Sequence, residues 1–186
     1  MVSFSLESDR GTIIEEILFN RSVQVDAFDE GENMRVVGRL SDKRLGEPLH
    51  GLEVQMQVSV WDGVIKEISG TMPTWPMEEC KQGLKSLDEL LGARIAPGFS
   101  ELVRRTIGSN RGCSHLAALI LNMGNTCIQG RGAYLRKHVP DNAARDRAMA
   151  QNAEELGLID SCVAWHEDGP IVRRWREEHP EDDPKY

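Results

Sequence analysis

The chain has 186 residues, of which 40% are hydrophobic and 28% are charged, and its 30 acidic against 22 basic side chains give a net charge of −8. This mixture is typical of one globular domain with a sizeable core and excludes wholesale disorder and collagen-like repeats. The acidic balance argues against nucleic acid or an anionic membrane as a partner, and the sequence contains neither an apolar run of ~20 residues nor a signal-peptide pattern, so we expect a soluble, cytoplasmic protein.

Apolar residues alternate with polar ones from residue 13 to residue 72, which predicts a half-buried antiparallel sheet. The alternation is clearest at Leu52, Val54, Met56, Val58 and Val60. Asp62-Gly63 then separates this run from the apolar residues that begin at Val64, and an Asp-Gly pair readily adopts the positive φ angles of a tight hairpin turn. The pattern therefore predicts a meander of strands.

The spacing of apolar residues changes to three and four after Pro73, which indicates helices. A first helix is expected between Pro76 and Gly92, a second over Phe99–Ile107, and a third from near Gly112 that carries apolar residues as far as Met123, so that the helices together span residues 77–128. The third is apolar on almost all sides and is expected to be buried. Because a sheet with one apolar face needs a cover, we predict an α+β fold in which these helices cover the meander.

The last quarter of the chain differs in charge, since residues 141–186 carry 6 basic and 12 acidic side chains. We divide the chain into an α+β domain at residues 1–140 and a helical C-terminal extension at residues 141–186. The extension is expected to hold a surface helix that reaches Leu158 and to end in an acidic tail. A one-sided sheet would leave an apolar patch, which favours a homodimer.

Three blocks of sequence resemble a bacterial family known as domain of unknown function 2889, over roughly residues 15–130. The first block is Leu40-Ser41-Asp42-Lys43 with Gly46-Glu47-Pro48-Leu49-His50, the second is Trp75-Pro76 and Cys80 followed by residues 90–99, and the third is Gly112-Cys113-Ser114-His115-Leu116. The resemblance implies no mechanism of its own. Such families are often met among functions of aromatic-compound breakdown, which hints at the substrate class.

Three residues are the candidates for catalysis: His115, His50 and Asp42. His115 lies in the first turn of an apolar helix, where unpaired backbone N–H groups disfavour a second positive charge and leave a neutral imidazole able to act as a base. The alternative is a core histidine bound to one backbone carbonyl. His50 stands at the start of the strongest strand and could be the acid or orienting partner, although strand-end histidines are more often surface residues.

Metal binding is the weaker interpretation of the same residues. His50 and His115 could be two of three ligands with Cys113 or Asp42, but Cys113 and His115 are two residues apart and so face different sides of a helix. The four cysteines also lack zinc-type spacing. We therefore predict no metal. We also predict no organic cofactor, because the absence of a P-loop and of a dinucleotide fingerprint disfavours phosphate transfer and Rossmann-type redox chemistry. The absence of a G-x-S-x-G elbow disfavours the usual esterase chemistry.

The candidates for substrate binding are Arg94, Lys43, Arg44, Trp75 and Cys113. A guanidinium or ammonium group at the mouth of a sheet can hold a carboxylate or phenolate, and a Trp can stack on an aromatic ring, although loop cations are usually solvated and a Trp often covers a core edge. Cys113 could be a nucleophile, whereas a buried inert thiol is the commoner outcome.

Together these residues favour a cofactor-independent lyase that acts on a small phenolic or aromatic acid by His-mediated proton abstraction, with elimination or carbon–carbon cleavage such as formaldehyde release. The alternatives are a small-molecule hydrolase and a non-catalytic ligand-binding or interaction module.

Overall fold

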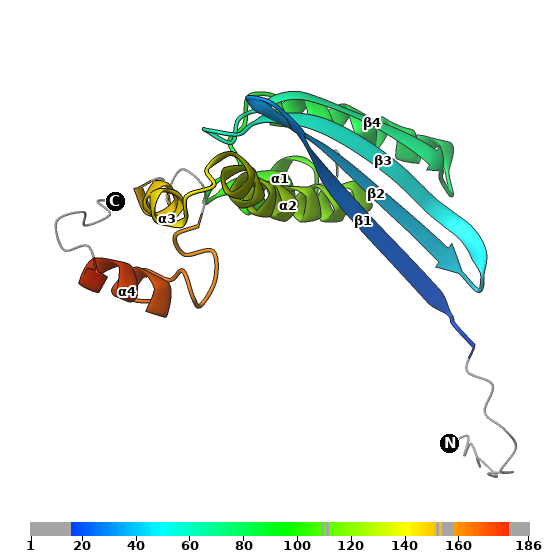
Figure 1. Cartoon of the computed structure of the whole chain (residues 1–186). Helices are drawn as coiled ribbons and strands as arrows, with labels where there is room; N and C mark the ends of the chain where they lie inside the picture. Colours follow the sequence, from blue (N-terminus) through cyan, green and yellow to red (C-terminus); the bar gives the residue numbers. More distant parts are fainter. Residues whose placement is uncertain (1–15, 109, 111, 152, 154–157, 179–186) are drawn as a thin grey trace, which may run out of the picture.

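The computed structural model describes residues 16–108, 110, 112–151, 153 and 158–178. Four strands form one antiparallel sheet in the order β1-β2-β3-β4 (Figure 1): β1 at Phe19–Glu30, β2 at Asn33–Arg44, β3 at Glu47–Ser59 and β4 at Ile65–Thr74. The predicted meander and the α+β class are confirmed. The expected start of the sheet near Ile13 lies outside the described residues.

The alternation of apolar and polar residues in the sequence corresponds to an alternation of buried and exposed side chains in the central strands. Val36 and Leu40 of β2, and Leu52, Val54 and Met56 of β3, are buried on one face of the sheet. Each such side chain contributes about 1.5–3 kcal/mol when it is fully removed from water. The opposite face carries polar pairs such as Arg39 with Glu53, whose Nε and Oε2 atoms lie 2.9 Å apart. One face of the sheet is therefore core and the other is open to solvent.

The Asp62-Gly63 pair lies in the connection between β3 and β4, as predicted. Gly63 has a φ of +69°, and the Asp62 side chain accepts a hydrogen bond from the Val64 N–H at 3.1 Å. The connection is longer than a two-residue turn because it occupies residues 60–64. Only one positive φ is needed there, and glycine supplies it without strain.

Three helical segments follow the sheet: η1 at Glu78–Leu90, α1 at Phe99–Thr106 and α2 at Ser114–His138. They lie on the same side of the sheet (Figure 1). The first is a 3₁₀ helix rather than an α-helix, which suits Leu84, Leu87 and Leu90 because a three-residue repeat places them along one side. The third extends ten residues beyond residue 128, the predicted limit of the helices, and is a helix of 25 residues.

Helix α2 crosses the core face of the sheet, into which it buries Leu116, Leu119, Ile120, Met123 and Cys127. Gly38 of β2 lies directly beneath it, and a Cβ atom at that position would be 2.6 Å from Met123 Sδ and 3.0 Å from Leu119 Cδ1. The absence of a side chain at Gly38 therefore sets how closely the helix approaches the sheet.

A buried arginine holds the second half of α2. Arg131 is 1% exposed, and its Nε donates to the Val60 carbonyl at 2.6 Å while its Nη2 donates to the Trp61 carbonyl. These carbonyls follow the last residue of β3, where the chain leaves the sheet. The guanidinium therefore ties the helix to the β3–β4 connection.

The C-terminal extension contains α3 at Asn142–Gln151 and α4 at Pro170–Glu178. Leu135 of α2, Ala153 and Leu158 form a second, smaller buried cluster there. The predicted surface helix corresponds to α3, which ends at Gln151. Residues 152 and 154–157, which precede Leu158, and the acidic tail lie outside the described residues. Among the described helices, none combines the length and apolar character of a membrane span.

Candidate functional site

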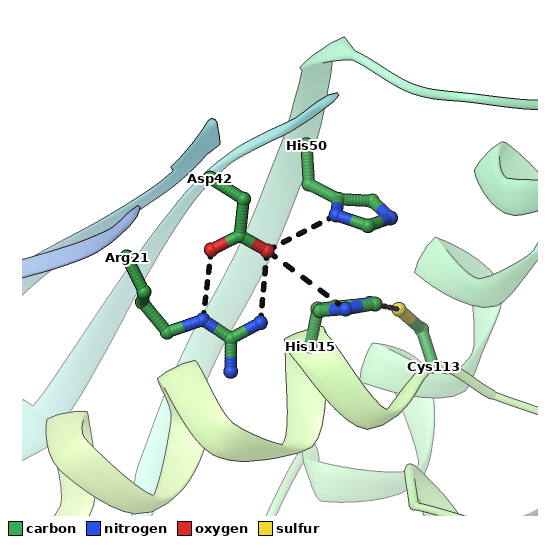
Figure 2. A network of polar contacts seen from close by, with 5 residues as sticks. All are labelled: Arg21, Asp42, His50, Cys113 and His115. Carbon is green, nitrogen blue, oxygen red and sulfur yellow. Dashed lines mark hydrogen bonds and ion pairs between the residues drawn. The ribbon is translucent and has the colours of Figure 1, made fainter. Parts of the chain in front are cut away.

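Three adjacent strands contribute one row of polar side chains at the end of the core face. In the register of the sheet, Arg21 of β1 is opposite Asp42 of β2, and Asp42 is opposite His50 of β3. Asp42 continues the buried row that passes through Leu40, and His50 continues the row that passes through Leu52. Since alternate residues of a strand share a face, the pattern that builds the core also brings these three groups together (Figure 2).

Asp42 is the centre of the network and is completely buried. Arg21 donates to it through two parallel hydrogen bonds, from Nε to Oδ1 and from Nη2 to Oδ2, each 2.8 Å long. This two-pronged pair holds the pKa of the Asp42 carboxyl below its usual value, against the opposing effect of burial, and it raises the pKa of Arg21. Asp42 is therefore a carboxylate at neutral pH.

His50 is oriented by this carboxylate, because its Nδ1 lies 3.0 Å from Asp42 Oδ2. An ionised carboxylate has no proton to give, so Nδ1 must carry the hydrogen in this contact, and in the neutral ring Nε2 is left with a lone pair. Figure 2 shows the second ring nitrogen of His50 pointing away from Asp42. The result is an imidazole whose tautomer is fixed and whose basic nitrogen is turned away from the carboxylate.

His115 comes from the first turn of α2 and stacks on His50, with ring centroids 3.9 Å apart and planes 29° from parallel. Its Nε2 lies 3.8 Å from Asp42 Oδ2, beyond hydrogen-bond length, and its Nδ1 lies 3.7 Å from Cys113 Sγ. Partial burial lowers the pKa of His115, and the neighbouring His50 and Arg21 lower it further, against the opposing effect of Asp42. His115 is therefore neutral at pH 7.

A carboxylate and two imidazoles are also a ligand set that transition-metal ions accept, and the candidate ligand atoms of Asp42, His50 and His115 lie within 4.8 Å of one another. Two features oppose this use. The lone pair of an imidazole nitrogen lies in the ring plane, and because the two ring planes are only 29° apart, the lone pairs run closer to parallel than the directions of two ligands around one metal ion. The Arg21 guanidinium also occupies both oxygens of Asp42 and places a positive charge beside the site. The geometry fits a proton-transfer network better than a metal centre.

The structure brings His115, His50, Asp42 and Cys113 together, and it places three of the predicted binding residues at the same end of the sheet. Lys43 and Arg44 end β2 just beyond Asp42, are exposed, and form no ion pair with any described residue. Trp75 follows the end of β4, close in register to the start of β3. Its Nε1 donates to Glu78 Oε1 at 3.0 Å, and the Lys81 ammonium lies 3.5 Å from the centre of its ring.

Arg94 does not join this group. Its Nε donates to the Asp62 carbonyl at 2.7 Å and its backbone bridges to Val64, so it belongs to the β3–β4 connection. His50 is at the opposite end of β3, a strand of 13 residues that spans ~40 Å at about 3.3 Å per residue. The prediction for Arg94 was wrong because the sequence of a loop does not indicate which end of the sheet the loop will contact.

Sequence reasoning missed Arg21, the residue that fixes Asp42. Its one sequence signal is its place two residues before Val23, in the alternating row of the first strand. An arginine in such a row reads as a surface residue until the register of β1 on β2 is known, because a shift of one residue would turn its side chain to the other face.

A cavity of about 440 Å³ lies elsewhere, between α3 and α4. It is lined by apolar side chains that include Trp165 and Trp175, and by charged side chains of both signs: Asp146, Arg147, Arg174 and Glu178. None of the residues selected from the sequence lines it, and its described lining contains no histidine or cysteine. Volume alone does not make a reactive site, so we place the candidate site at the His50–His115 pair.

Comparison with known proteins adds one match. A family model described as a protein of unknown function, DUF2889, matches residues 19–129. The matched range begins at the start of β1 and includes Arg21, Asp42, His50 and His115. No curated protein and no solved structure matches the chain.

Proposed function

Because this chain belongs to the DUF2889 family, whose description names no activity, we propose a function from the site itself: a cofactor-independent lyase that cleaves a small phenolic or aromatic catabolite by proton abstraction. The observation that carries the proposal is the stacked imidazole pair, in which His50 is hydrogen-bonded to the buried carboxylate of Asp42 and His115 is held neutral. Such a pair can take a proton from a substrate and return it without a metal or an organic cofactor.

The geometry favours His50 as the base, whereas the sequence alone favours His115. The carboxylate of Asp42 fixes the Nδ1–H tautomer of His50 and stabilises the imidazolium that forms when Nε2 accepts a proton. His115 has no described carboxylate at hydrogen-bond distance, and its neutral ring is suited to hold the substrate hydroxyl or the leaving group. Arg21 takes no proton in this scheme, because its role is to keep Asp42 ionised and in place.

A phenolic side-chain alcohol suits this arrangement. His50 takes the proton of the primary hydroxyl, the O–H electron pair becomes the carbonyl bond of formaldehyde, and the carbon–carbon bond breaks. Its electron pair forms a carbon–carbon double bond as an oxygen leaving group departs from the adjoining benzylic carbon, and that oxygen receives the proton from His50. The ionised phenol ring assists the departure by electron donation, and the exposed Lys43 and Arg44 would hold the phenolate.

We also propose that the protein acts in the cytoplasm. All four cysteines are unpaired, with Cys127 buried and Cys162 exposed, which fits a reducing compartment.

The proposal is tested by incubating the protein with lignin-derived phenolic alcohols and aromatic acids, followed by mass spectrometry and a formaldehyde assay. We expect free formaldehyde and a product that has lost CH₂O together with the protonated oxygen leaving group, or CH₂O alone where that oxygen stays tethered to the product. We expect His50→Gln and His115→Ala each to slow product formation by ~10²-fold or more. His138→Ala is the matched control, because this histidine contacts Asp29 at the other end of α2.

Each of the other outcomes would favour a different function or mechanism. A product that has gained water would replace the lyase with a hydrolase. A thermal shift without product in every compound would favour the ligand-binding module. Full turnover in both His50→Gln and His115→Ala would remove the chemistry from the pair, and loss of turnover on treatment with a chelator would overturn the metal-free mechanism.

A further inference from the structure

Among the described residues, none pairs with the outer edge of strand β1. It is the first strand of the sheet and pairs only with β2, over all twelve of its residues and without a register shift. Helices pack against both outer strands, η1 against β4 and α2 against β1. Natural sheets shield an outer edge with charged side chains, prolines, bulges or a covering segment. Within the described residues β1 carries Arg21, Asp26, Asp29 and Glu30, but it has no proline, no bulge and no further strand along its outer edge.

The hydrogen-bond pattern shows which backbone groups face outward. The Leu45 N–H donates to the Leu18 carbonyl at 3.0 Å, so Leu18 and the even-numbered residues that follow bond toward β2. The odd-numbered residues from Phe19 to Asp29 therefore turn their N–H and C=O groups to the open edge. This edge is an unused template for another antiparallel strand.

Several side chains on or near this strand are large, apolar and exposed. Five large apolar residues are 37–68% exposed on or just before β1: Ile17, Leu18, Phe19, Val23 and Phe28. Their burial at about 25 cal/mol per Å² would offset the cost of association. The edge thus offers both the hydrogen-bonding groups and the apolar area that an interface needs.

We propose that two copies of the chain associate through β1, antiparallel about a two-fold axis at Val23, and join their sheets into one continuous sheet. Val23 is odd-numbered, so its outward N–H and C=O can pair with those of Val23 in the second copy. This register sets Leu18 opposite Phe28 and Asp26 opposite Asn20, sets no like charges opposite each other within β1, and just before β1 sets Glu16 opposite Glu30. A register centred on Gln24 would instead set Leu18 opposite Glu30.

The pairing would also reach the candidate site, although the inference does not depend on the proposed function. Arg21 lies on β1, and its side chain is 36% exposed while its guanidinium holds Asp42. A second copy along the edge would cover part of this exposed side chain. The ion pair would then lie deeper in the protein, where it is less screened by water.

The test is sedimentation velocity of the full chain over a wide range of protein concentration. We expect a dimer in the wild type and a monomer in Val23→Lys, which sets two ammonium groups opposite each other at the axis. Ser22→Lys is the matched control, because it adds the same charge opposite Gln24 of the second copy and should remain a dimer. Val23→Pro removes an outward N–H that β2 does not use and should also be monomeric.

Amide hydrogen exchange provides an independent measurement. The even-numbered amides of β1 should be protected at every concentration, and the odd-numbered ones only where the dimer is populated. A wild type that remains a monomer at all concentrations would overturn the proposal. So would a dimer that survives Val23→Lys, since that dimer must use another surface. If Val23→Pro fails to fold, Val23→Lys decides the question.

Discussion

Replacing Asp42 by Asn tests the central link of the site, because the change keeps the shape of the side chain and removes its charge. The wild-type carboxylate accepts two hydrogen bonds from Arg21 and one from His50. Hydrogen bonds to charged groups contribute about 1.5–3 kcal/mol each, but Arg21 is 36% exposed and water replaces part of what it loses. We therefore expect a loss of about 2 kcal/mol in the free energy of unfolding.

For a chain of this length a loss of that size lowers the melting temperature by ~4–8 °C. The exposed Asp26 is a matched control, because its carboxylate lies 3.7 Å from Arg39 in a solvated pair, and Asp26→Asn should change stability by less than about 0.5 kcal/mol. Both values can be read from thermal unfolding followed by circular dichroism.

The same variant also reports on the tautomer of His50. If the introduced amide gives its one oxygen to Arg21, its NH₂ group faces Nδ1 of His50 and favours the ring with the hydrogen on Nε2. We expect ¹⁵N NMR of the imidazole to show the Nδ1–H form in the wild type and the Nε2–H form in Asp42→Asn. An unchanged tautomer together with an unchanged melting temperature would refute the argument that Asp42 orients His50.

Three further predictions concern packing, pH and thiol chemistry. Gly38→Ala should lower the free energy of unfolding by about 1–3 kcal/mol, because the added methyl group overpacks the space beneath α2. Gly132→Ala should raise the free energy of unfolding slightly, because the Cβ position is open and alanine forms helices better than glycine. Both values can be measured by urea unfolding. The lowered pKa of His115 means that the unfolded chain binds its proton more readily, so stability should fall as the pH drops below about 6.5, and His115→Gln should flatten that part of the curve; an unchanged slope would contradict the assignment. Burial raises the pKa of Cys127 to about 12, so iodoacetamide followed by mass spectrometry should label exposed Cys162 first and leave Cys127 unlabelled until the chain unfolds.

Much of the fold could be predicted because it depends on local periodicity. The two-residue alternation from Leu52 to Val60 marks β3, and the three-residue spacing of Leu84, Leu87 and Leu90 marks a helical segment. The 3₁₀ form of that segment was not predicted, because apolar residues at intervals of three and four are more typical of an α-helix. The last ten residues of α2, after residue 128, were not predicted, because polar residues such as Arg131 do not continue the apolar stripe.

The site was predictable to the extent that it continues a local pattern. Asp42 and His50 extend the buried rows of their strands, and His115 stands at the start of an apolar helix. Arg21 was not found, because its pairing with Asp42 depends on strand register, which no local pattern states. Arg94 was grouped with the histidines for the related reason that a loop sequence does not reveal which end of a sheet it will reach.

The hydrogen bonds of Arg131 fix α2 to the β3–β4 connection, and the same helix carries His115 of the candidate site. His115 and Arg131 are sixteen residues apart on one continuous helix, a distance of ~24 Å at about 1.5 Å per residue. In the C-terminal half of α2, the Arg131 guanidinium donates hydrogen bonds to the Val60 and Trp61 carbonyls. At the N-terminal end of the helix, the His115 imidazole stacks on His50. A substitution that weakens the hydrogen bonds of Arg131 would allow α2 to slide or tilt as one rigid body. Substitutions around the distant connection should therefore act on the spacing of the two imidazole rings, and the tolerance of the site to mutation is set in part at the opposite end of the sheet.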